Sequence, residues 1–582
     1  MPLSQKRLLF NETHTASANR LYRLDEEKQL RFQLGYIHDR TTRQYGSEEI
    51  YYFVQDTVHT ATNRHDRLKT DCLNAEVNYE DNTVSRYTRE NFSFAGTWKS
   101  GVSDITGDNA IFQKIKNSQW ELKNYFNQLY TKEKYTWGIR LYIRYTHCPA
   151  SLTVAHRNLP ILFADNMLIA NCIYHRNELS SPDNISENTY RTVIGQTHES
   201  ILAEYEEMNT GNAYTDNVLY GMRKINGVNY QLTGGFCGEL SSVKQENAYS
   251  AHSYSFYTVP RIEWERNDFL FTAATTVRWS HLPKQSYSRF CVSPFFCFRY
   301  KFTPRWKMSL LGSLDESEGG LKDIYPFRYR EDYRTVVKHT GKVPVTVRQL
   351  YTCYLEYKNT IKEFFWTLSA SYSHNRYNLI TERNYKDGNF YLSSVERNHS
   401  SHSYTLNTIG SKGIYDWNLK TSLELTLARN EGKQLNEGIV QDYRYDYLCI
   451  EPKIVWAPSV FFEAEYKATV SCVGGGIGED TSLDPLWEVA QRLTLSLEFH
   501  DTEFRLSGEH FYNDLSKNQH LNIWLADVSL IHKVGKWRFA ASAINLFNKE
   551  QYRYTLYSAV QSYTSWIKLR PREFMVSVQY QW

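Results

Sequence analysis

The chain has 582 residues and a formal net charge of only +3, which is too small to argue for nucleic acid as a partner. Its nine cysteines form no close pairs, which argues against a disulfide framework or a zinc site, and no apolar run reaches the roughly 20 residues of a membrane-spanning helix. The unusual quantity is the aromatic content, 15%, with 45 Tyr, 29 Phe and 14 Trp. Tyr and Trp, with an apolar body and a polar tip, suit membrane–water interfaces.

Two regions are expected along the chain. Residues 1–25 are an N-terminal segment that enters the sheet or forms part of a first strand, and they carry no charged-then-apolar signal sequence. Residues 26–582 read as one unit, because no Pro/Ser/Gly-rich linker divides them.

Strict alternation of apolar and polar residues recurs from one end of this unit to the other, which indicates β-strands with two different solvents on their two faces. The runs are longer than soluble strands usually are and match tilted strands that cross a bilayer. Trp137 and Tyr145 bound one of them, as an aromatic girdle at each interface would require. The clearest runs are 30–36, 137–145, 269–279, 296–302, 366–372, 462–470, 493–499 and 574–582.

Short and long connections alternate between these runs. Tight turns are expected at 266–268, 303–305, 359–360, 412–413, 457–459, 500–502 and 534–535, and long polar loops at 315–348, 374–401, 429–444, 473–487 and 549–568. Short turns at one end and long loops at the other are typical of outer-membrane barrels. The predicted fold is therefore an all-β, antiparallel, up-and-down transmembrane barrel of about 20–22 strands, the size range in which a barrel holds an internal plug.

The last strand is expected to close the barrel. In hydrocarbon every backbone N–H and C=O group needs a partner, so the sheet has no free edge and its last strand pairs with its first. The apolar face of that strand would carry the closure and assembly signal, in residues Phe574, Val576, Val578, Tyr580 and Trp582.

No residue pattern points to catalysis or to a metal ion. The stretch Gly474–Gly478 lacks the Lys-Ser/Thr of a phosphate-binding loop, and Glu463 and Glu465 fit a charged lumen wall better than a pair of catalytic acids. The polar faces of the strands supply the candidate substrate-binding residues, Arg140, Arg144, Arg299, Lys301, Glu463, Glu465 and Lys467. The loop at 315–348, which mixes acids, Arg and Tyr, is either a substrate-capturing loop or simply solvated.

The C-terminal residues carry a family resemblance. Asn545-Leu546-Phe547-Asn548, then Tyr552, Arg570-Pro571-Arg572 and the final Trp582 resemble the end of TonB-dependent outer-membrane receptors, and residues 21–39 look like an early barrel strand of these proteins. The resemblance implies a 22-stranded barrel that takes up a scarce nutrient, such as an iron–siderophore complex, cobalamin or an oligosaccharide. It also implies that Trp582 is recognised by the barrel-assembly machinery.

The chain departs from that family in one respect, since no signal peptide, TonB-contacting box or plug domain is recognisable. We therefore expect the barrel portion of a truncated or split transporter in the outer membrane, in contact with lipid. A plug and TonB would be partners only if an upstream segment supplied them, and no cofactor is expected. The alternatives are a passive, porin-like channel and a soluble all-β carbohydrate-binding or hydrolytic protein.

Overall fold

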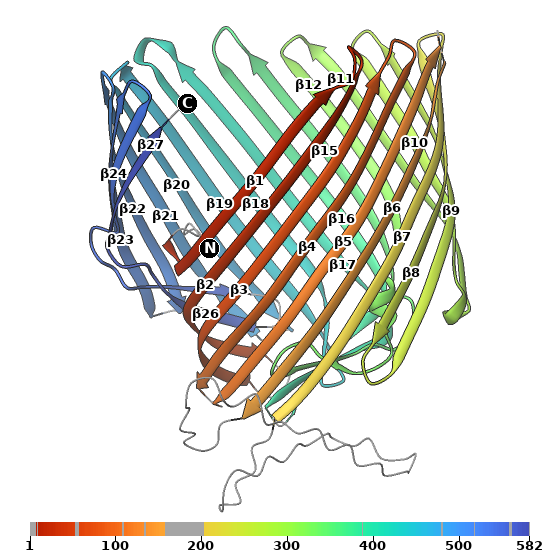
Figure 1. The fold of residues 1–582 in the computed structure, drawn as a ribbon, viewed down its shortest axis with the longest axis horizontal. Helices are drawn as coiled ribbons and strands as arrows, with labels where there is room; N and C mark the ends of the chain where they lie inside the picture. The colour runs from red at the N-terminus through yellow and green to blue at the C-terminus, as the bar shows by residue number, and fades with distance from the viewer. Residues whose placement is uncertain are drawn as a thin grey trace, which may run out of the picture.

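The computed structural model describes residues 7–8, 10–52, 57–107, 110–132, 135–156, 203–386, 388–478, 481–516, 518–557 and 561–580. These residues form a single 27-stranded sheet that curls into a barrel (Figure 1). Among them, no helix is long and apolar enough to cross a membrane. The all-β barrel predicted from the alternating runs is thus confirmed.

The strands vary from two to 26 residues in length. Their bounds are β1 Phe10–Arg23, β2 Lys28–Tyr52, β3 Thr57–Asn82, β4 Arg86–Gly107, β5 Ile111–Lys132, β6 Tyr135–His156, β7 Ala203–Ile225, β8 Val228–Lys244, β9 Ala248–Arg266, β10 Phe269–Leu282, β11 Tyr287–Thr303, β12 Trp306–Glu318, β13 Tyr329–Arg330, β14 Thr335–Lys338, β15 Val345–Asn359, β16 Phe364–Lys386, β17 Asn389–Ile414, β18 Leu419–Asn436, β19 Ile439–Ser459, β20 Phe462–Ile477, β21 Thr481–Phe499, β22 Thr502–Ser516, β23 Gln519–Val534, β24 Trp537–Ile544, β25 Gln551–Tyr557, β26 Gln561–Lys568 and β27 Glu573–Tyr580.

The wall is built from antiparallel neighbours. Strands β2 to β12, β15 to β24 and β27 make 22 wall strands, and β1 adds one more beside β2. In the described connections between strands there are three short 3-10 helices, Pro283–Gln285, Leu321–Ile324 and Tyr415–Trp417. The short strands β13, β14, β25 and β26 lie at the end of the barrel that carries the long connections, at the bottom of Figure 1.

The ladder register separates two faces all the way round the wall. Directly paired residues of an antiparallel sheet share a face, so the face of Arg140 can be followed from strand to strand through Val218, Gly235, Tyr257, Arg278 and Cys291. This face is polar and lines the lumen. The opposite face is apolar and exposed, as at Leu219 (61%) and Phe290 (64%).

Aromatic side chains form two rings on the outer, apolar face. Beside the short turns lie contacting pairs such as Tyr130–Trp137, Phe269–Tyr300, Trp306–Tyr357 and Trp537–Tyr580. Nearer the long connections lie Trp98, Trp120, Trp279, Tyr404, Trp487 and Trp524. From Phe269 to Trp279 is ten residue steps on β10. At a rise of about 3.3 Å and a tilt of about 40°, these steps span about 25 Å, the height of the apolar band of an outer-membrane barrel.

Several predicted loops are strands in the structure. The segments 374–401, 429–444 and most of 473–487 extend the hairpins β16–β17, β18–β19 and β20–β21, and 549–568 contains the β25–β26 hairpin. Their polar composition misled the sequence interpretation, because a strand that continues into water needs no apolar face. Five of the seven short turns lie where predicted. The β17–β18 turn falls at residues 415–417 instead of 412–413, and the β19–β20 turn falls at residues 460–461 instead of 457–459.

The seam of the barrel differs from the simple closure that we expected. Within the described residues β27 pairs only with β24, and the free edge of β2 is shared by β1, over Gln29–Thr42, and β26, over Tyr45–Tyr51. Because β1 and β27 run in the same direction, both suit that edge and β1 occupies it. Phe574, Val576, Val578 and Tyr580 face outward on β27 as predicted, while Trp582 lies outside the described residues.

The C-terminal sequence motif forms a hydrogen-bonded turn beside the seam, with Asn545 and Tyr552 buried in it. Asn545 is 2% exposed and adopts a left-handed φ of 54°. Its Nδ2 donates to the carbonyl oxygens of Lys549 (2.9 Å) and Arg570 (2.8 Å), and its Oδ1 accepts from the Lys549 N–H (3.0 Å). Tyr552 is fully buried and its hydroxyl accepts from Asn513. The motif therefore shapes the turn that leads into β27.

Candidate functional site: the lumen and its bridged mouth

All seven candidate residues lie on the lumen face of the wall. Arg140 and Arg144 are on β6, Arg299 and Lys301 on β11, and the remaining three on β20. The ladder register links these three strands to the same face. The seven residues do not converge on one site, because the three strands are separated around the wall. All seven lie in the half of the wall nearer the short turns. The three candidates on β20 are Glu463, Glu465 and Lys467.

The two β6 arginines enter a hydrogen-bonded patch. Arg140 contacts Asp216 (Nη2 to Oδ2, 3.3 Å), whose other oxygen accepts from the Tyr257 hydroxyl at 2.7 Å. The guanidinium of Arg144 lies 5.3 Å from the centre of the Tyr214 ring. Arginine and tyrosine donors of this kind suit polar solutes, but Arg140 and Tyr257 are already paired with Asp216.

The other candidates are local ion pairs or single charges. Lys453 bridges Glu465 at 3.2 Å, and Lys467 bridges Glu451 at 3.5 Å. These pairs are half exposed, and pairs of this type contribute about 0–1 kcal/mol each. They make the lumen wall hydrophilic without forming a specific pocket.

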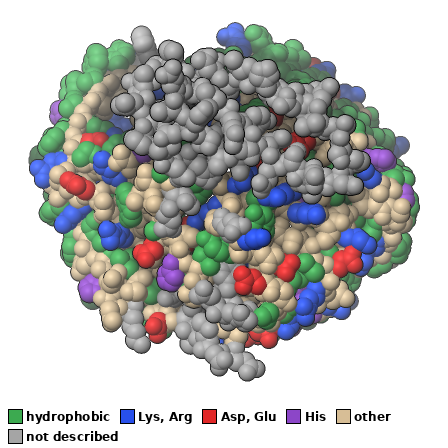
Figure 2. Space-filling view, turned by 90° about the horizontal axis from the view of Figure 1, so that it is seen from below, with side chains coloured by type: hydrophobic (Ala, Val, Ile, Leu, Met, Phe, Trp, Pro, Cys, Tyr) green, Lys and Arg blue, Asp and Glu red, His purple; other side chains and the backbone are tan. Residues whose placement is uncertain are grey.

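A bridge crosses the long-loop mouth of the barrel, and it is made by the connection between β12 and β15. Part of this connection packs on the lumen wall, where Ile324, Tyr325 and Val343 are buried against β9 and β10. Further along, β14 pairs in parallel with β17, Thr335–Lys338 opposite Phe390–Ser393. Figure 2 looks onto this end, where Lys and Arg side chains are interspersed with Asp and Glu.

Arg334 lies at the centre of the bridge. It reaches β2 and β3, donating from Nη2 to Glu49 at 2.6 Å and from Nη1 to Thr60 at 3.0 Å. The side chains of Arg334 and Glu49 are only 14% and 9% exposed, so the ion pair is shielded from water. A buried pair costs desolvation on both sides, and its loss on one side leaves an uncompensated charge.

Aromatic rings surround Arg334 and join opposite walls. Tyr51 on β2 and Phe390 on β17 are both buried, and their ring centres lie 4.3 Å apart. In Figure 1 β2 belongs to the front wall and β17 to the back wall, so this contact spans the mouth. Burial raises the pKa of the Tyr51 phenol, the Arg334 charge opposes this rise, and the hydrogen bond to Glu49 adds to it.

Arg383 is the second arginine of the bridge. It projects from the lumen face of β16, and its guanidinium lies 5.7 Å from the centre of the Tyr51 ring. Its Nη1 is buried and has no hydrogen-bond partner. The Glu49 carboxylate already accepts hydrogen bonds from the Tyr51 hydroxyl and from Arg334.

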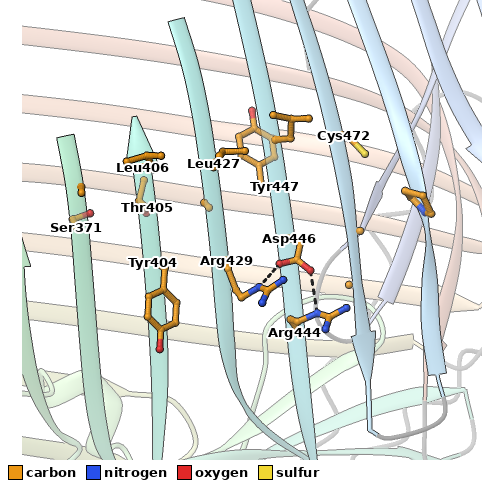
Figure 3. Close-up of a pocket in the computed structure, with 16 residues that line it drawn as sticks. Ser371, Tyr404, Thr405, Leu406, Leu427, Arg429, Arg444, Asp446, Tyr447 and Cys472 are labelled. Atoms are coloured by element: carbon orange, nitrogen blue, oxygen red, sulfur yellow. Dashed lines mark hydrogen bonds and ion pairs between the residues drawn. The ribbon is translucent and has the colours of Figure 1, made fainter. Parts of the chain in front are cut away.

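A separate cavity of about 740 Å³ lies on the outer face (Figure 3). Its walls are Leu406 and Leu427 on one side and the Arg429–Asp446–Arg444 cluster on the other, with Asp446 accepting from both guanidinium groups at 2.6 and 3.0 Å. By the ladder register these side chains point away from the lumen. The cavity is therefore not on a path through the barrel.

The part of the chain that the structure describes contains no cluster of three or more His, Cys, Asp or Glu residues that could hold a metal ion. The eight described cysteines are free thiols. The glycines at 474–476, which we expected in a loop, belong to β20, and Gly475 and Gly476 pair with β21.

The chain resembles known proteins only at a distance. No protein-family model matches the chain, and no match was found among curated proteins. Solved structures that resemble it include the outer-membrane transporter YddB of Escherichia coli, with 10% identity, a TM-score of 0.49, and coverage of 97% of this chain and 76% of that one. The copper transporter OprC has 8% identity and a TM-score of 0.45, with coverage of 97% of this chain and 84% of that one. A variant of the ferric enterobactin receptor PfeA of Pseudomonas aeruginosa has 10% identity and a TM-score of 0.45, with coverage of 96% of this chain and 80% of that one.

Likenesses at 10% identity or less and TM-scores below 0.5 are too distant to assign a family or a ligand. The assignment as a barrel therefore rests on the strand pairing of the chain itself, and the function is argued below from its two faces and its mouth.

Proposed function

We propose that this chain is the barrel portion of an outer-membrane transporter of the TonB-dependent type, which takes up a scarce nutrient such as an iron–siderophore complex, cobalamin or an oligosaccharide. The observation that carries the proposal is the two-faced wall. Its outer face is an apolar band of about 25 Å between two aromatic rings, and its inner face is polar. A sheet that curls into a barrel with such faces presents apolar side chains to lipid and leaves a hydrophilic path inside.

The mouth favours a transporter over an open pore. The end with the long connections would face outward, and it is there that the bridge joins opposite walls through Arg334. A passive channel needs a mouth that stays open, whereas a receptor needs a mouth that a ligand can engage. The bridge is thus the element that separates this proposal from the porin-like alternative.

Two classes of partner follow. Lipid contacts the outer face, and the assembly machinery would recognise β27, with its apolar residues Phe574, Val576, Val578 and Tyr580 outward. A plug domain and TonB belong to the proposal only where an upstream segment provides them. The polar lumen candidates, Arg140, Arg144, Arg299, Lys301, Glu463, Glu465 and Lys467, would form the hydrophilic wall along which the solute moves.

An uptake assay in the native cell tests the transport mechanism. Cells that carry the gene and cells that lack it are grown with one limiting nutrient at a time, drawn from ferric siderophores, cobalamin and oligosaccharides. We expect one nutrient to enter only in the presence of the gene, and a protonophore to abolish that uptake, because energised import depends on the inner membrane. Gene-dependent uptake that persists with the protonophore would contradict the proposal and favour the passive channel.

A further inference from the structure

Arg383 is a partly buried cation, and the described residues supply no counter-ion for it. It lies on β16 opposite Leu392 of β17 and beside Asn436 at the tip of β18. Its neighbours Leu435 and Asn436 are 4% and 2% exposed, so the tip of β18 shields one side of it from water. Burial lowers the pKa of the Arg383 guanidinium, and the neighbouring Tyr51 opposes that shift.

Two polar atoms at and near Arg383 have no hydrogen-bond partner among the described residues. Its Nη1 donor has no partner, and nearby on β18 the Oε1 acceptor of Gln434, which is 7% exposed, has none either. The adjacent Glu382 does not serve, because it points to the other face and accepts from Ser393 at 3.3 Å. Removing water from a guanidinium without giving it a carboxylate is unfavourable, and a bound anion would offset that cost.

The neighbouring arginine shows the difference. Arg334 has Glu49 as its counter-ion, and Tyr51 lies between the two arginines, with Arg334 donating to its hydroxyl at 3.3 Å. The Asp332 carboxylate is a second charged neighbour of Arg334, whereas no carboxylate among the described residues pairs with Arg383. Arginine binds carboxylate and phosphate groups through two parallel hydrogen bonds, a geometry that the free edge of Arg383 can supply.

We propose that Arg383 is an oxyanion-binding site at the mouth of the barrel, which takes the carboxylate or phosphate group of a small solute. The aromatic rings of Tyr51 and Phe390 form the apolar side of this site. The site rests on the proposed function in one respect: its place in the mouth makes the bound anion part of the solute that enters. The class of substrate is then an anionic one, although the lumen wall below has mixed charges.

Thermal unfolding of the purified barrel in detergent tests the site without any transport. The probe is inorganic phosphate, added at constant ionic strength against sodium chloride. We expect the unfolding temperature of the wild type to rise with phosphate, because a ligand that binds only the folded state stabilises it. In Arg383→Met the unfolding temperature without phosphate should equal or exceed that of the wild type, and the response to phosphate should fall by at least about tenfold in apparent affinity.

A matched control separates a specific site from net charge. Arg397 is exposed on the adjacent β17, so Arg397→Met removes the same charge from the same end of the barrel. It should keep the phosphate response of the wild type, and Arg383→Lys, which folds with its charge intact, should keep only part of it.

Three results would overturn the proposal: no phosphate response in the wild type, an unchanged response in Arg383→Met, or an equal loss in Arg397→Met. None of them depends on uptake. A failed site would therefore leave the transporter proposal standing, and failed uptake would leave the anion site standing.

Discussion

Replacing Arg334 with methionine is expected to open the mouth of the barrel. The substitution removes the bonds to Glu49 and Thr60 and leaves the Glu49 carboxylate buried without its cation. Breaking one side of a buried ion pair costs about 3–5 kcal/mol, which is enough to release the contact between Tyr51 and Phe390 that joins the two walls. In planar bilayers the variant should pass a larger and steadier current than the wild type, and proteases should cut the connection between β12 and β15 sooner.

A double variant serves as the control for that result. Arg334→Met combined with Glu49→Gln removes both charges, so no uncompensated carboxylate is left, and the mouth should close again in part. If Arg334→Met conducts as the wild type does, the bridge does not gate the barrel. The same conclusion would follow if the double variant were more open than the single one.

Asn545→Ala is expected to destabilise the barrel more than any other substitution in the C-terminal motif. It removes the hydrogen bonds to two carbonyl groups and one N–H and places alanine at a left-handed φ. Together these changes cost about 3–5 kcal/mol. Heat-dependent mobility on gels, which separates folded from unfolded barrels, should show a lower unfolding temperature.

Asn545→Gly separates the two causes in this case. Glycine adopts the left-handed conformation without strain, so it should recover about 1 kcal/mol of the loss while the hydrogen bonds stay broken. Equal stability of the alanine variant and the wild type would show that the Asn545 hydrogen bonds do not stabilise the barrel. Equal stability of the two variants would show that the backbone conformation contributes nothing.

The sequence was sufficient to predict the wall and its two faces. Period-two runs such as those containing Arg140 and Phe296 fix which side chain faces which solvent, because a single-residue slip would turn every side chain to the wrong face. The seven lumen candidates lie on one face for that reason. Their dispersal over three strands could not be predicted, since the runs give the face of a residue but not its neighbours around the barrel.

The mouth and the seam were not predictable from local patterns. Arg334 lies in the loop that was singled out as a possible capturing loop, but Glu49, Tyr51 and Arg383 come from strands whose tips meet only after the wall has curled. At the seam, local alternation made both β1 and β27 suitable partners for β2. Which of the two occupies the edge is decided by long-range pairing, which no short stretch of sequence records.

Depth-resolved accessibility along β18 tests the central claim, that the apolar face of the wall touches lipid and the polar face touches water. Single spin labels would be placed at each position from Thr421 to Ala428 in a variant whose native cysteines are serine, reconstituted in bilayers. The account predicts that labels at odd positions, such as Leu423 and Leu425, respond to oxygen dissolved in lipid, and that labels at even positions respond to a water-soluble nickel complex. Access of the nickel complex to both sets, or no alternation between them, would contradict it.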